Sequence, residues 1–242
     1  MVRVRLVNHL PRVPAVTRLI DVISGTQALL LDFDGPVCSV FAGYTAEMVA
    51  EDLRNSLRRQ GVTFPADIAA SRDPLQVLRW VGDTNPGITQ FADDVLTAAE
   101  RRAVATAEPT AGSSKVITAA ARTGRQIAIV SNNSHAAITA YLERHRLTPY
   151  VRLVVGRAYA QPALMKPHTH SVARALNALG VNASASVLVG DSPTDMEAAH
   201  TMHVRTIGYA KDPARATGLG EAQADIVINT MRSLVTALEA MA

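Results

Sequence analysis

Six short apolar runs, separated by helical patterns, constrain the fold of this chain more than any other feature. They are ALLLDF (28–33), QIAIVS (126–131), VRLVVG (151–156), SVLVGD (186–191), VRTIGY (204–209) and DIVINT (225–230). Most of them precede an amphipathic stretch, such as SHAAITAYLERHRL, THSVARALNALG or MRSLVTALEAMA. Continuous apolar strands that alternate with helices are typical of a parallel sheet covered on both faces. The pattern therefore predicts an α/β fold.

One interval interrupts this alternation. Between Ser39 and about Pro109 no strand-like run occurs, and only helical patterns are found over about seventy residues. The two ends of the interval, CSVFAGY and AEPTAGS, carry the Gly, Pro and Ser residues that linkers favour. We therefore predict a helical cap inserted into the α/β core. The predicted divisions are an N-terminal extension at 1–26, the core at 27–38 and 110–242, and the cap at 39–109.

The extension has features of mature protein. Its first residues, MVRVRLVNHLPRVP, contain no uninterrupted apolar region and no convincing small-residue cleavage site, so we do not expect a signal peptide. The stretch TRLIDVISG is predicted to form a short helix capped by Thr17. No run reaches the roughly 18 apolar residues that a membrane span needs. The one cysteine, Cys38, has no partner for an intramolecular disulfide, so we expect the protein to reside in a reducing cytoplasm. We expect Cys38 itself to be a small packing residue.

The charge of the chain gives little reason to expect a nucleic-acid partner. The 242 residues include 24 basic and 21 acidic side chains, with a net charge of +3 and no long block of one sign. Interspersed charges of this kind are typical of an ordinary protein surface. We expect a monomer or a homodimer that acts on a small molecule.

Polar residues occur where the apolar runs end. The first run contains Asp32 and is followed by Asp34. Alternation along an extended chain places these two aspartates on one side, with Phe33 on the other. At a separation of roughly 5 Å and an effective dielectric of about 20, the two carboxylates would repel each other by about 3 kcal/mol. A compensating positive charge is therefore expected beside them.

Other strand ends supply more polar groups. The second run ends at Ser131 and is followed by Asn132. Lys166 precedes the fourth run, which ends at Asp191, and Asp195 comes four residues later. The carboxyl ends of parallel strands meet at one edge of a sheet, where ligands of such folds bind. Carboxylates that converge on a lysine and a hydroxyl suit a divalent hard cation and a phosphate, and Mg²⁺ prefers such oxygen ligands.

The motifs DFDGP, SNN, KP and GDSPTD, in this order, resemble the four motifs of the haloacid dehalogenase superfamily, in its phosphatase branch. The resemblance extends from about Gln27 to the C-terminus. It implies a Rossmann-like core, with a helical cap of the C1 type between the first two motifs. It also implies a magnesium-dependent hydrolase of small phosphomonoesters.

The resemblance assigns a role to each motif residue. Asp32 would be the nucleophile that forms an aspartyl phosphate, and Asp34 would protonate the leaving group and then deprotonate water. The phosphoryl group would be bound by the backbone N–H groups of Phe33 and Asp34 and by Ser131, Asn132 and Lys166. The metal would be held by Asp32, Asp191 and the backbone carbonyl of Asp34, and Asp195 would orient a metal-bound water or the lysine.

The sequence leaves some alternatives open. Pro36 stands where the superfamily usually has Thr or Val, and its fixed φ is expected to stiffen the turn into the cap. Within the superfamily, a phosphoglucomutase-like or phosphonate-hydrolysing enzyme would keep the same core. A catalytically idle binding module is the alternative from another class.

Several other residues have conventional structural interpretations. The two histidines after the lysine are expected to be solvated or to cap a helix, and the two large aromatic residues of the insert are expected to lie in the core of the cap. Two arginines receive no role. These residues are His168 and His170, Trp80 and Phe91, and Arg79 and Arg157.

Overall fold

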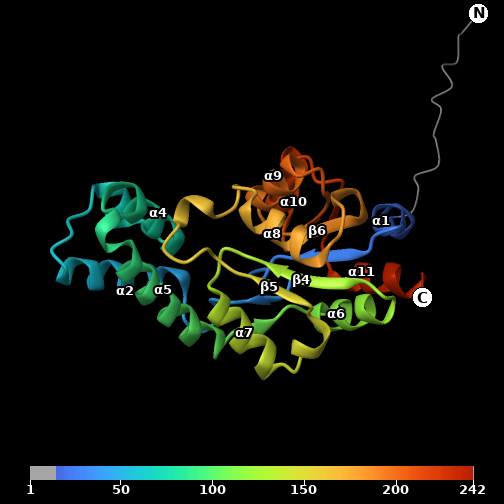
Figure 1. Ribbon diagram of the computed structural model, residues 1–242, viewed down its shortest axis with the longest axis horizontal. Helices are drawn as coiled ribbons and strands as arrows, with labels where there is room; N and C mark the ends of the chain where they lie inside the picture. Colours follow the sequence, from blue (N-terminus) through green and yellow to red (C-terminus); the bar gives the residue numbers. More distant parts are fainter. Residues whose placement is uncertain (1–14, 242) are drawn as a thin grey trace, which may run out of the picture.

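The fold is built on a six-stranded parallel sheet, seen in a computed structural model that describes residues 15–241 (Figure 1). The strand order is β5-β4-β1-β6-β7-β8. The strands are β1 (Ala28–Leu31), β4 (Gln126–Val130), β5 (Leu153–Val155), β6 (Ser186–Gly190), β7 (Arg205–Tyr209) and β8 (Ile226–Ile228). Each lies within one of the six apolar runs, so the predicted α/β parallel-sheet fold is confirmed.

Helices cover both faces of the sheet because every central strand is apolar on both sides. Leu29 and Leu31 of β1 belong to the apolar cluster on one face, and Leu30 belongs to the cluster on the other. The first face carries α1 (Ala15–Ile23), α6 (Ser113–Arg122), α7 (His135–Arg144) and α11 (Met231–Glu239). The second carries α8 (His170–Leu179), α9 (Pro193–Thr201) and α10 (Pro213–Glu221). Figure 1 shows the sheet between these two layers.

Helix α1 precedes the sheet and packs against α11 and β8. It buries Leu19 and Ile23 in the apolar cluster, as expected for a short amphipathic helix. The predicted helix is therefore present, but the predicted cap at Thr17 is wrong. The described helix covers Ala15–Ile23, so Thr17 lies within the helix and not at a cap. Residues 1–14, which include most of the predicted extension, lie outside the described part of the chain.

The interval without long strands forms a group of helices. It contains α2 (Ala46–Arg59), α3 (Ala66–Ala70), α4 (Pro74–Thr84), the 3-10 helix η1 (Pro86–Ile88) and α5 (Thr89–Val104). The Thr45 side chain caps α2 by accepting from Met48 N, and Asp73 caps α4, where Pro74 occupies the first turn. These helices lie at the blue-green to green end of the molecule in Figure 1.

The two predicted linkers are more ordered than expected. The short strands β2 (Cys38–Ser39) and β3 (Glu108–Pro109) pair antiparallel and join the two ends of the insert. Buried residues of the insert, including Leu53 and Leu96, belong to the same apolar cluster as Leu29 of β1. The division into extension, core and cap remains a prediction.

The insert packs against the core at two places. Helix α5 contacts α7, and α4 contacts the 3-10 helix η3 (Pro162–Leu164), which precedes the lysine motif. At the second place Gly82 lies so close to Pro162 that an added side-chain carbon would overlap the proline ring. The insert thus faces the segment that leads to Lys166.

The aromatic residues of the insert differ in environment. Trp80 is half-buried and its ring lies 5.2 Å from that of Phe64, in agreement with a place in the apolar interior. Phe91, which we expected in the same interior, is 36% exposed, so that prediction is wrong. The buried face of α5 runs through Ala92, Leu96 and Ala99, and Phe91 lies beside this stripe.

Two further expectations concern the whole chain. Among residues 15–241, none of the helices has the length and apolar character required to cross a bilayer. Cys38 is fully buried, with its Sγ 3.9 Å from the carbonyl oxygen of Phe33, so it is a packing residue as predicted. Burial, together with the nearby carboxylates, raises the pKa of its thiol.

Candidate active site

A cavity of about 250 Å³ lies at the carboxyl ends of the central strands, under helix α4. The motif residues that line it are Asp32, Asp34, Ser131, Asn132, Lys166, Asp191 and Asp195. Three strands position them, because β1 ends just before Asp32, β4 just before Ser131 and β6 just before Asp191. The structure thus brings these predicted site residues together at one edge of the sheet.

Lys166 is the central cation of this cavity. Its Nζ donates to Asp32 Oδ1 at 2.8 Å, to Val130 O at 2.9 Å and to Asp195 Oδ1. Burial lowers the pKa of Lys166, but the carboxylates of Asp195 and Asp32 outweigh burial and raise the pKa above its ordinary value. Lys166 is therefore a permanent positive charge and hydrogen-bond donor, and it does not act as a base.

Two of the carboxylates have pKa values near neutrality. Burial raises the pKa of Asp32 to about 7, against the opposing effect of Lys166. Burial also raises the pKa of Asp191 to about 8, and the charge of Asp32 contributes to that rise. Burial and mutual repulsion of the carboxylates thus outweigh the nearby cations, Lys166 for Asp32 and Arg215 for Asp191.

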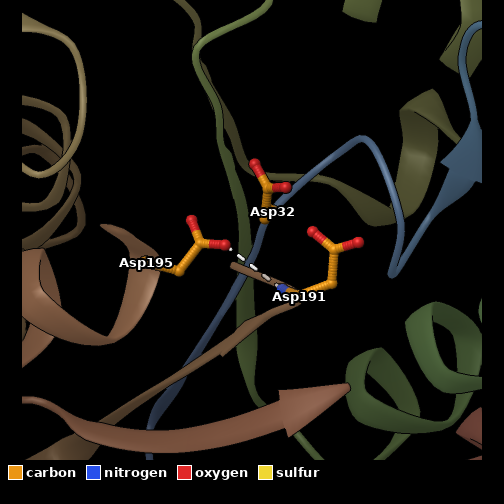
Figure 2. Close-up of side chains that lie close together, drawn as sticks. All are labelled: Asp32, Asp191 and Asp195. Atoms are coloured by element: carbon orange, nitrogen blue, oxygen red, sulfur yellow. Dashed lines mark hydrogen bonds between the residues drawn. The ribbon is translucent and has the colours of Figure 1, made fainter. Parts of the chain in front are cut away.

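Three carboxylates are placed where a divalent cation fits. Oxygen atoms of Asp32, Asp191 and Asp195 all lie within 4.8 Å of one another, and Figure 2 shows the three side chains around a common space. Such a set of hard oxygen donors suits Mg²⁺. The predicted ligands were Asp32, Asp191 and the backbone carbonyl of Asp34, whereas this side-chain cluster includes Asp195. The donor chemistry fits the ion in either case.

Asp195 is fixed by the start of helix α9. Its Oδ2 accepts from the N–H groups of Ser192 and Asp191, and the Ser192 side chain accepts from Asp195 N, which completes a capping box. An added side-chain carbon at Gly190 would overlap the Asp195 carboxyl group. The capping box and the close approach of Gly190 therefore hold the Asp195 carboxylate in the position from which it contacts Lys166.

Asp34 lies on the turn that follows β1. Its Oδ1 accepts from Val40 N at 2.9 Å. Burial raises the pKa of Asp34, and the Val40 N–H opposes that rise. Gly35 has a φ of 115°, and an added side-chain carbon there would overlap Asp191. Phe33 points the other way, into the core, where its ring lies 5.2 Å from that of Tyr141.

The turn after β4 holds both the serine hydroxyl and the lysine segment. Asn133 N donates to Ser131 Oγ at 3.3 Å, and Ser131 Oγ lies 3.2 Å from Asn133 Oδ1. Asn132 Oδ1 accepts from Lys166 N at 2.8 Å, and Asn132 Nδ2 donates to Lys166 O at 3.3 Å. Asn132 thus fixes the backbone at Lys166, and its predicted contact with substrate remains a prediction.

Two arginines at the cavity have contacts that the sequence did not indicate. Arg79 of α4 lines the cavity, and its Nη2 donates to Lys166 O at 3.1 Å. Arg215 of α10 forms an ion pair with Asp191 Oδ2 and donates to Asp191 O at 3.3 Å. A single arginine on a helix carries no sequence signal of this kind, because its partners come from distant segments.

A buried ion network beside the cavity was also missed. Arg157, which follows β5, pairs with Asp93 and Glu100 of α5, and all three side chains are at most 3% exposed. One signal was available, since the two acidic residues are seven positions apart and so share a helix face that is otherwise apolar. Their basic partner was not indicated.

His168 is exposed, as expected for a solvated histidine, and His170 is half-buried. His168 Nδ1 accepts from His170 N at 3.1 Å at the start of α8, and the two ring centroids are 6.4 Å apart. The His168 ring thus contacts the first residue of α8, whose N-cap is Thr169.

The comparison with protein families agrees with this arrangement. Residues 74–209 match the model of the haloacid dehalogenase-like hydrolases. The chain belongs to this family. The match covers more than half of the chain and contains the serine, lysine and second aspartate motifs of the cavity. The predicted membership of this superfamily, in its phosphatase branch, and the predicted enzyme class are confirmed.

Curated relatives of this hydrolase are phosphatases. The chain is 28% identical over 212 residues to a phosphoglycolate phosphatase of Rhodospirillum rubrum, covering 79% of this chain and 84% of the relative. It is 27% identical over 187 residues to a phosphoglycolate phosphatase of Caulobacter vibrioides, covering 76% and 70%, respectively.

Solved structures share the fold of this hydrolase. A predicted phosphatase from Clostridium acetobutylicum has a TM-score of 0.68 at 15% identity, over 89% of this chain and 99% of that chain. CbbY from Rhodobacter sphaeroides, solved in complex with phosphate, has a TM-score of 0.67 at 19% identity, over 88% and 99%.

Proposed function

We propose that this hydrolase is a magnesium-dependent phosphatase that cleaves a small phosphomonoester through an aspartyl phosphate on Asp32. The placement of Asp32 carries the proposal. Its carboxylate is buried at the end of β1, 2.8 Å from Lys166 Nζ, and it shares a cavity with Asp34. A carboxylate held in one direction by a fixed cation is suited to attack a phosphorus atom.

The first half of the reaction transfers the phosphoryl group to Asp32. Lys166 holds Oδ1, which leaves Oδ2 of Asp32 for attack on phosphorus. The bond between phosphorus and the alcohol oxygen breaks as the new P–O bond forms. Asp34 enters this step protonated and gives its proton to the departing alcohol. Burial favours that protonated form, because it raises the pKa of Asp34.

The second half releases phosphate. Asp34, now ionised, takes a proton from water, and the water oxygen attacks phosphorus of the aspartyl phosphate. The bond between phosphorus and Asp32 breaks, which regenerates the carboxylate and yields inorganic phosphate. One residue thus serves both halves, and the proton that it loses in the first half returns in the second.

Several donors would stabilise the charge on the transferring oxygens. Lys166 and Ser131 line the cavity beside Asp32, and the backbone N–H groups of Phe33 and Asp34 belong to the same turn. Preorganised donors of this kind act strongly in a site that excludes water.

Magnesium would be held by Asp32, Asp191 and the backbone carbonyl of Asp34. When bound, the ion supplies positive charge that keeps the carboxylates ionised and neutralises phosphoryl oxygens. Asp195 would orient a bound water or Lys166, to which it is already paired. Burial, followed by repulsion among the carboxylates, raises the pKa values of Asp32 and Asp191, and a bound cation would offset both effects.

The substrate class that we propose is a small phosphate ester with a second anionic group. Phosphoglycolate, named for the relatives in Rhodospirillum and Caulobacter, is the first compound to test. Arg79 is suited to hold its carboxylate, since it lines the cavity from α4 and no carboxylate of residues 15–241 forms an ion pair with it. The buried free thiol of Cys38 suits a cytoplasmic location.

Hydrolysis of para-nitrophenyl phosphate, with and without Mg²⁺, tests the proposed function. We expect turnover that needs the ion, is lost with a chelator and returns when Mg²⁺ is added. The matched control is Asp32→Asn, which keeps the volume of the side chain and removes its nucleophilicity. Absence of hydrolysis across para-nitrophenyl phosphate and a panel of small phosphate esters would instead favour the idle binding module.

A further inference from the structure

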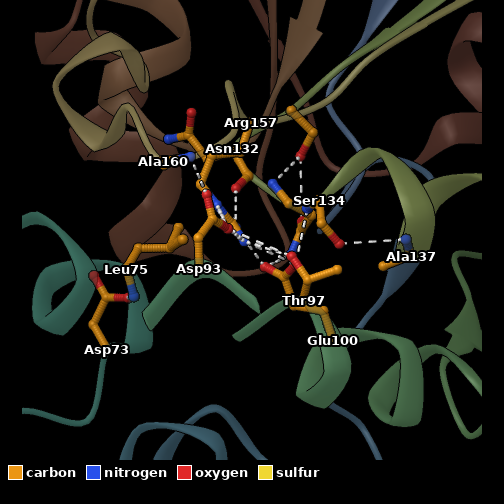
Figure 3. Close-up of polar contacts among 12 residues, drawn as sticks. Asp73, Leu75, Asp93, Thr97, Glu100, Asn132, Ser134, Ala137, Arg157 and Ala160 are labelled. Carbon is orange, nitrogen blue, oxygen red and sulfur yellow. Dashed lines mark hydrogen bonds and ion pairs between the residues drawn. The ribbon is translucent and has the colours of Figure 1, made fainter. Parts of the chain in front are cut away.

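The helical insert reaches the turn after β4 through Glu100 of α5. Glu100 Oε2 accepts from Ser134 N at 2.8 Å (Figure 3). Its Oε1 accepts from Asn133 Nδ2 at 3.3 Å. The Glu100 side chain is fully buried. A carboxylate from the insert therefore accepts hydrogen bonds from two N–H donors of the turn that follows β4.

Arg157 holds this carboxylate in place. Its Nη1 donates to Glu100 Oε1 at 2.8 Å and to Asn132 O at 2.9 Å, and its backbone N donates to Asn133 O at 2.8 Å. Burial lowers the pKa of Arg157, but Glu100 and Asp93 outweigh that effect and raise it. The guanidinium group thus remains charged and contacts both the turn and the residue that binds the turn.

Hydrogen bonds within the turn after β4 connect Glu100 to the cavity. Asn133 joins Glu100 to Ser131, because its Nδ2 donates to Glu100 while its backbone N and its Oδ1 contact Ser131 Oγ. Ser131 lines the cavity beside Asp32 and Lys166. A chain of hydrogen bonds therefore runs from a helix of the insert to the serine hydroxyl.

We propose that Glu100 is a positioning residue, which the insert supplies and Arg157 fixes, and which orients the Ser131–Ser134 turn for binding the phosphoryl group. The proposal rests on the proposed function, in which this turn contacts the phosphoryl oxygens. If the proposal holds, the phosphate site has its binding geometry only when α5 is packed against the core. Glu100 itself touches no reacting atom.

Asp93 provides a matched comparison for Glu100. It lies on the same helix, is equally buried and pairs with the same arginine, with its Oδ1 2.6 Å from Arg157 Nη2. Its other oxygen accepts from Ala160 N at 2.7 Å, away from the turn after β4. If both residues only stabilised the fold, their replacement would affect phosphate binding and activity equally. If Glu100 positions the turn, its replacement would affect them more than replacement of Asp93.

The experiment compares Glu100→Gln and Asp93→Asn in the full chain, with inorganic phosphate as the probe in a buffer that contains Mg²⁺. Calorimetry gives the phosphate dissociation constant, para-nitrophenyl phosphate gives kcat and KM, and thermal unfolding gives Tm. We expect Tm to fall in both variants. Phosphate affinity and kcat/KM should fall about tenfold or more in Glu100→Gln, the loss expected for one charge-assisted hydrogen bond, and change less than about twofold in Asp93→Asn.

Asn133→Ala is a second variant, which tests the same connection if Glu100→Gln fails to fold. It removes the amide that joins Glu100 to Ser131 and leaves both ion pairs of Arg157 intact, so it should weaken phosphate binding with a smaller change in Tm. Equal losses of phosphate affinity in the Glu100 and Asp93 variants would overturn the inference. So would unchanged phosphate affinity in Asn133→Ala.

The same measurements on the unmodified protein separate this inference from the proposed function. If the unmodified protein neither hydrolyses phosphate esters nor binds phosphate, both proposals fail. If it does both and the Glu100 and Asp93 variants behave alike, only the positioning role fails.

Discussion

Lys166 Nζ lies 2.8 Å from Asp32 Oδ1, although the two residues are far apart in sequence and both are almost excluded from water. The pair places a permanent positive charge against the proposed nucleophile. Asp195 accepts a hydrogen bond from the same ammonium group. The lysine therefore pairs with Asp32 at the end of β1 and with Asp195 in the first turn of α9, and Asp191 is left with the exposed Arg215 as its cationic partner.

Replacement of Asp191 tests the proposed metal site. Asp191→Asn keeps the shape of the side chain and removes one anionic oxygen donor, so we expect a higher Mg²⁺ concentration for half-maximal activity and weaker Mg²⁺ binding by calorimetry. The Tm should change little. Glu197→Gln, at an exposed position of α9, is the control and should leave both values unchanged. An unchanged Mg²⁺ affinity in Asp191→Asn would remove this residue from the ligand set.

Gly35→Ala tests how closely the turn after β1 must approach Asp191. The substitution combines a positive φ with a side-chain carbon that overlaps the Asp191 carboxyl group. We expect a loss of stability of about 1 kcal/mol from the backbone and a large loss of activity from displacement of Asp191. The unfolding free energy and kcat/KM measure the two effects separately.

Gly61→Ala is the matched control for this substitution. Gly61 also has a positive φ, 83°, but no other atom lies within 4 Å of the added carbon. It should show the backbone cost alone, with full activity. Equal activity in the two glycine variants would contradict the proposed constraint at Asp191.

Arg79→Ala tests the proposed contact with a second anionic group. Because Arg79 lines the cavity, removal of its guanidinium group should raise KM for 2-phosphoglycolate by about tenfold or more. The KM for para-nitrophenyl phosphate, whose leaving group carries no carboxylate, should change far less. Arg72→Ala, at a side chain that is 80% exposed, is the control. Parallel changes for both substrates would indicate that Arg79 acts only through Lys166.

The sequence predicted the parts of this protein that depend on local pattern. The sheet could be predicted because strands such as Leu29–Leu31 are apolar at every position, as burial on both faces requires. The proximity of Asp32, Ser131 and Asp191 could also be predicted, because each follows a parallel strand. The carboxyl ends of parallel strands lie at one edge of the sheet, independently of the loops that connect them.

Features that depend on tertiary contacts could not be predicted in this way. Arg157 meets Glu100 only because α5 packs beside the loop after β5, and nothing near either residue in sequence marks the pairing. The β2–β3 pair joins segments separated by the whole insert. Phe91 was assigned to an interior by residue type, but the side of α5 that it occupies depends on where α7 and α2 lie.

Cys38 should resist modification in the folded protein. Its thiol is fully buried, and burial together with the negative charges of Asp34 and Asp32 raises its pKa, so the reactive thiolate is scarce at pH 8. We expect iodoacetamide to label the folded protein far more slowly than the denatured protein, as measured by intact mass. Rapid labelling of the folded protein, with no loss of Tm, would contradict this expectation.

The two aspartates of the first motif should have different roles when each is changed to asparagine. Asp32→Asn removes the attacking oxygen, so neither a phosphoenzyme nor turnover is expected. Asp34→Asn removes only proton transfer, a contribution of about a hundredfold to ten-thousandfold. Para-nitrophenolate leaves without a proton, so the first step should survive in this variant, whereas attack by water should slow for want of a base.

Phosphoenzyme should therefore accumulate in Asp34→Asn and be absent in Asp32→Asn. Rapid-quench trapping with radiolabelled para-nitrophenyl phosphate, followed by peptide mapping, locates the label. The same map distinguishes the neighbouring nucleophiles, of which Ser131 lines the cavity and Cys38 is fully buried. A label on either of these, or on His168 or His170, would assign the nucleophile elsewhere and overturn the mechanism. Label on the peptide that contains Asp32, lost in Asp32→Asn alone, is the expected result, since that carboxylate is the one held by Lys166.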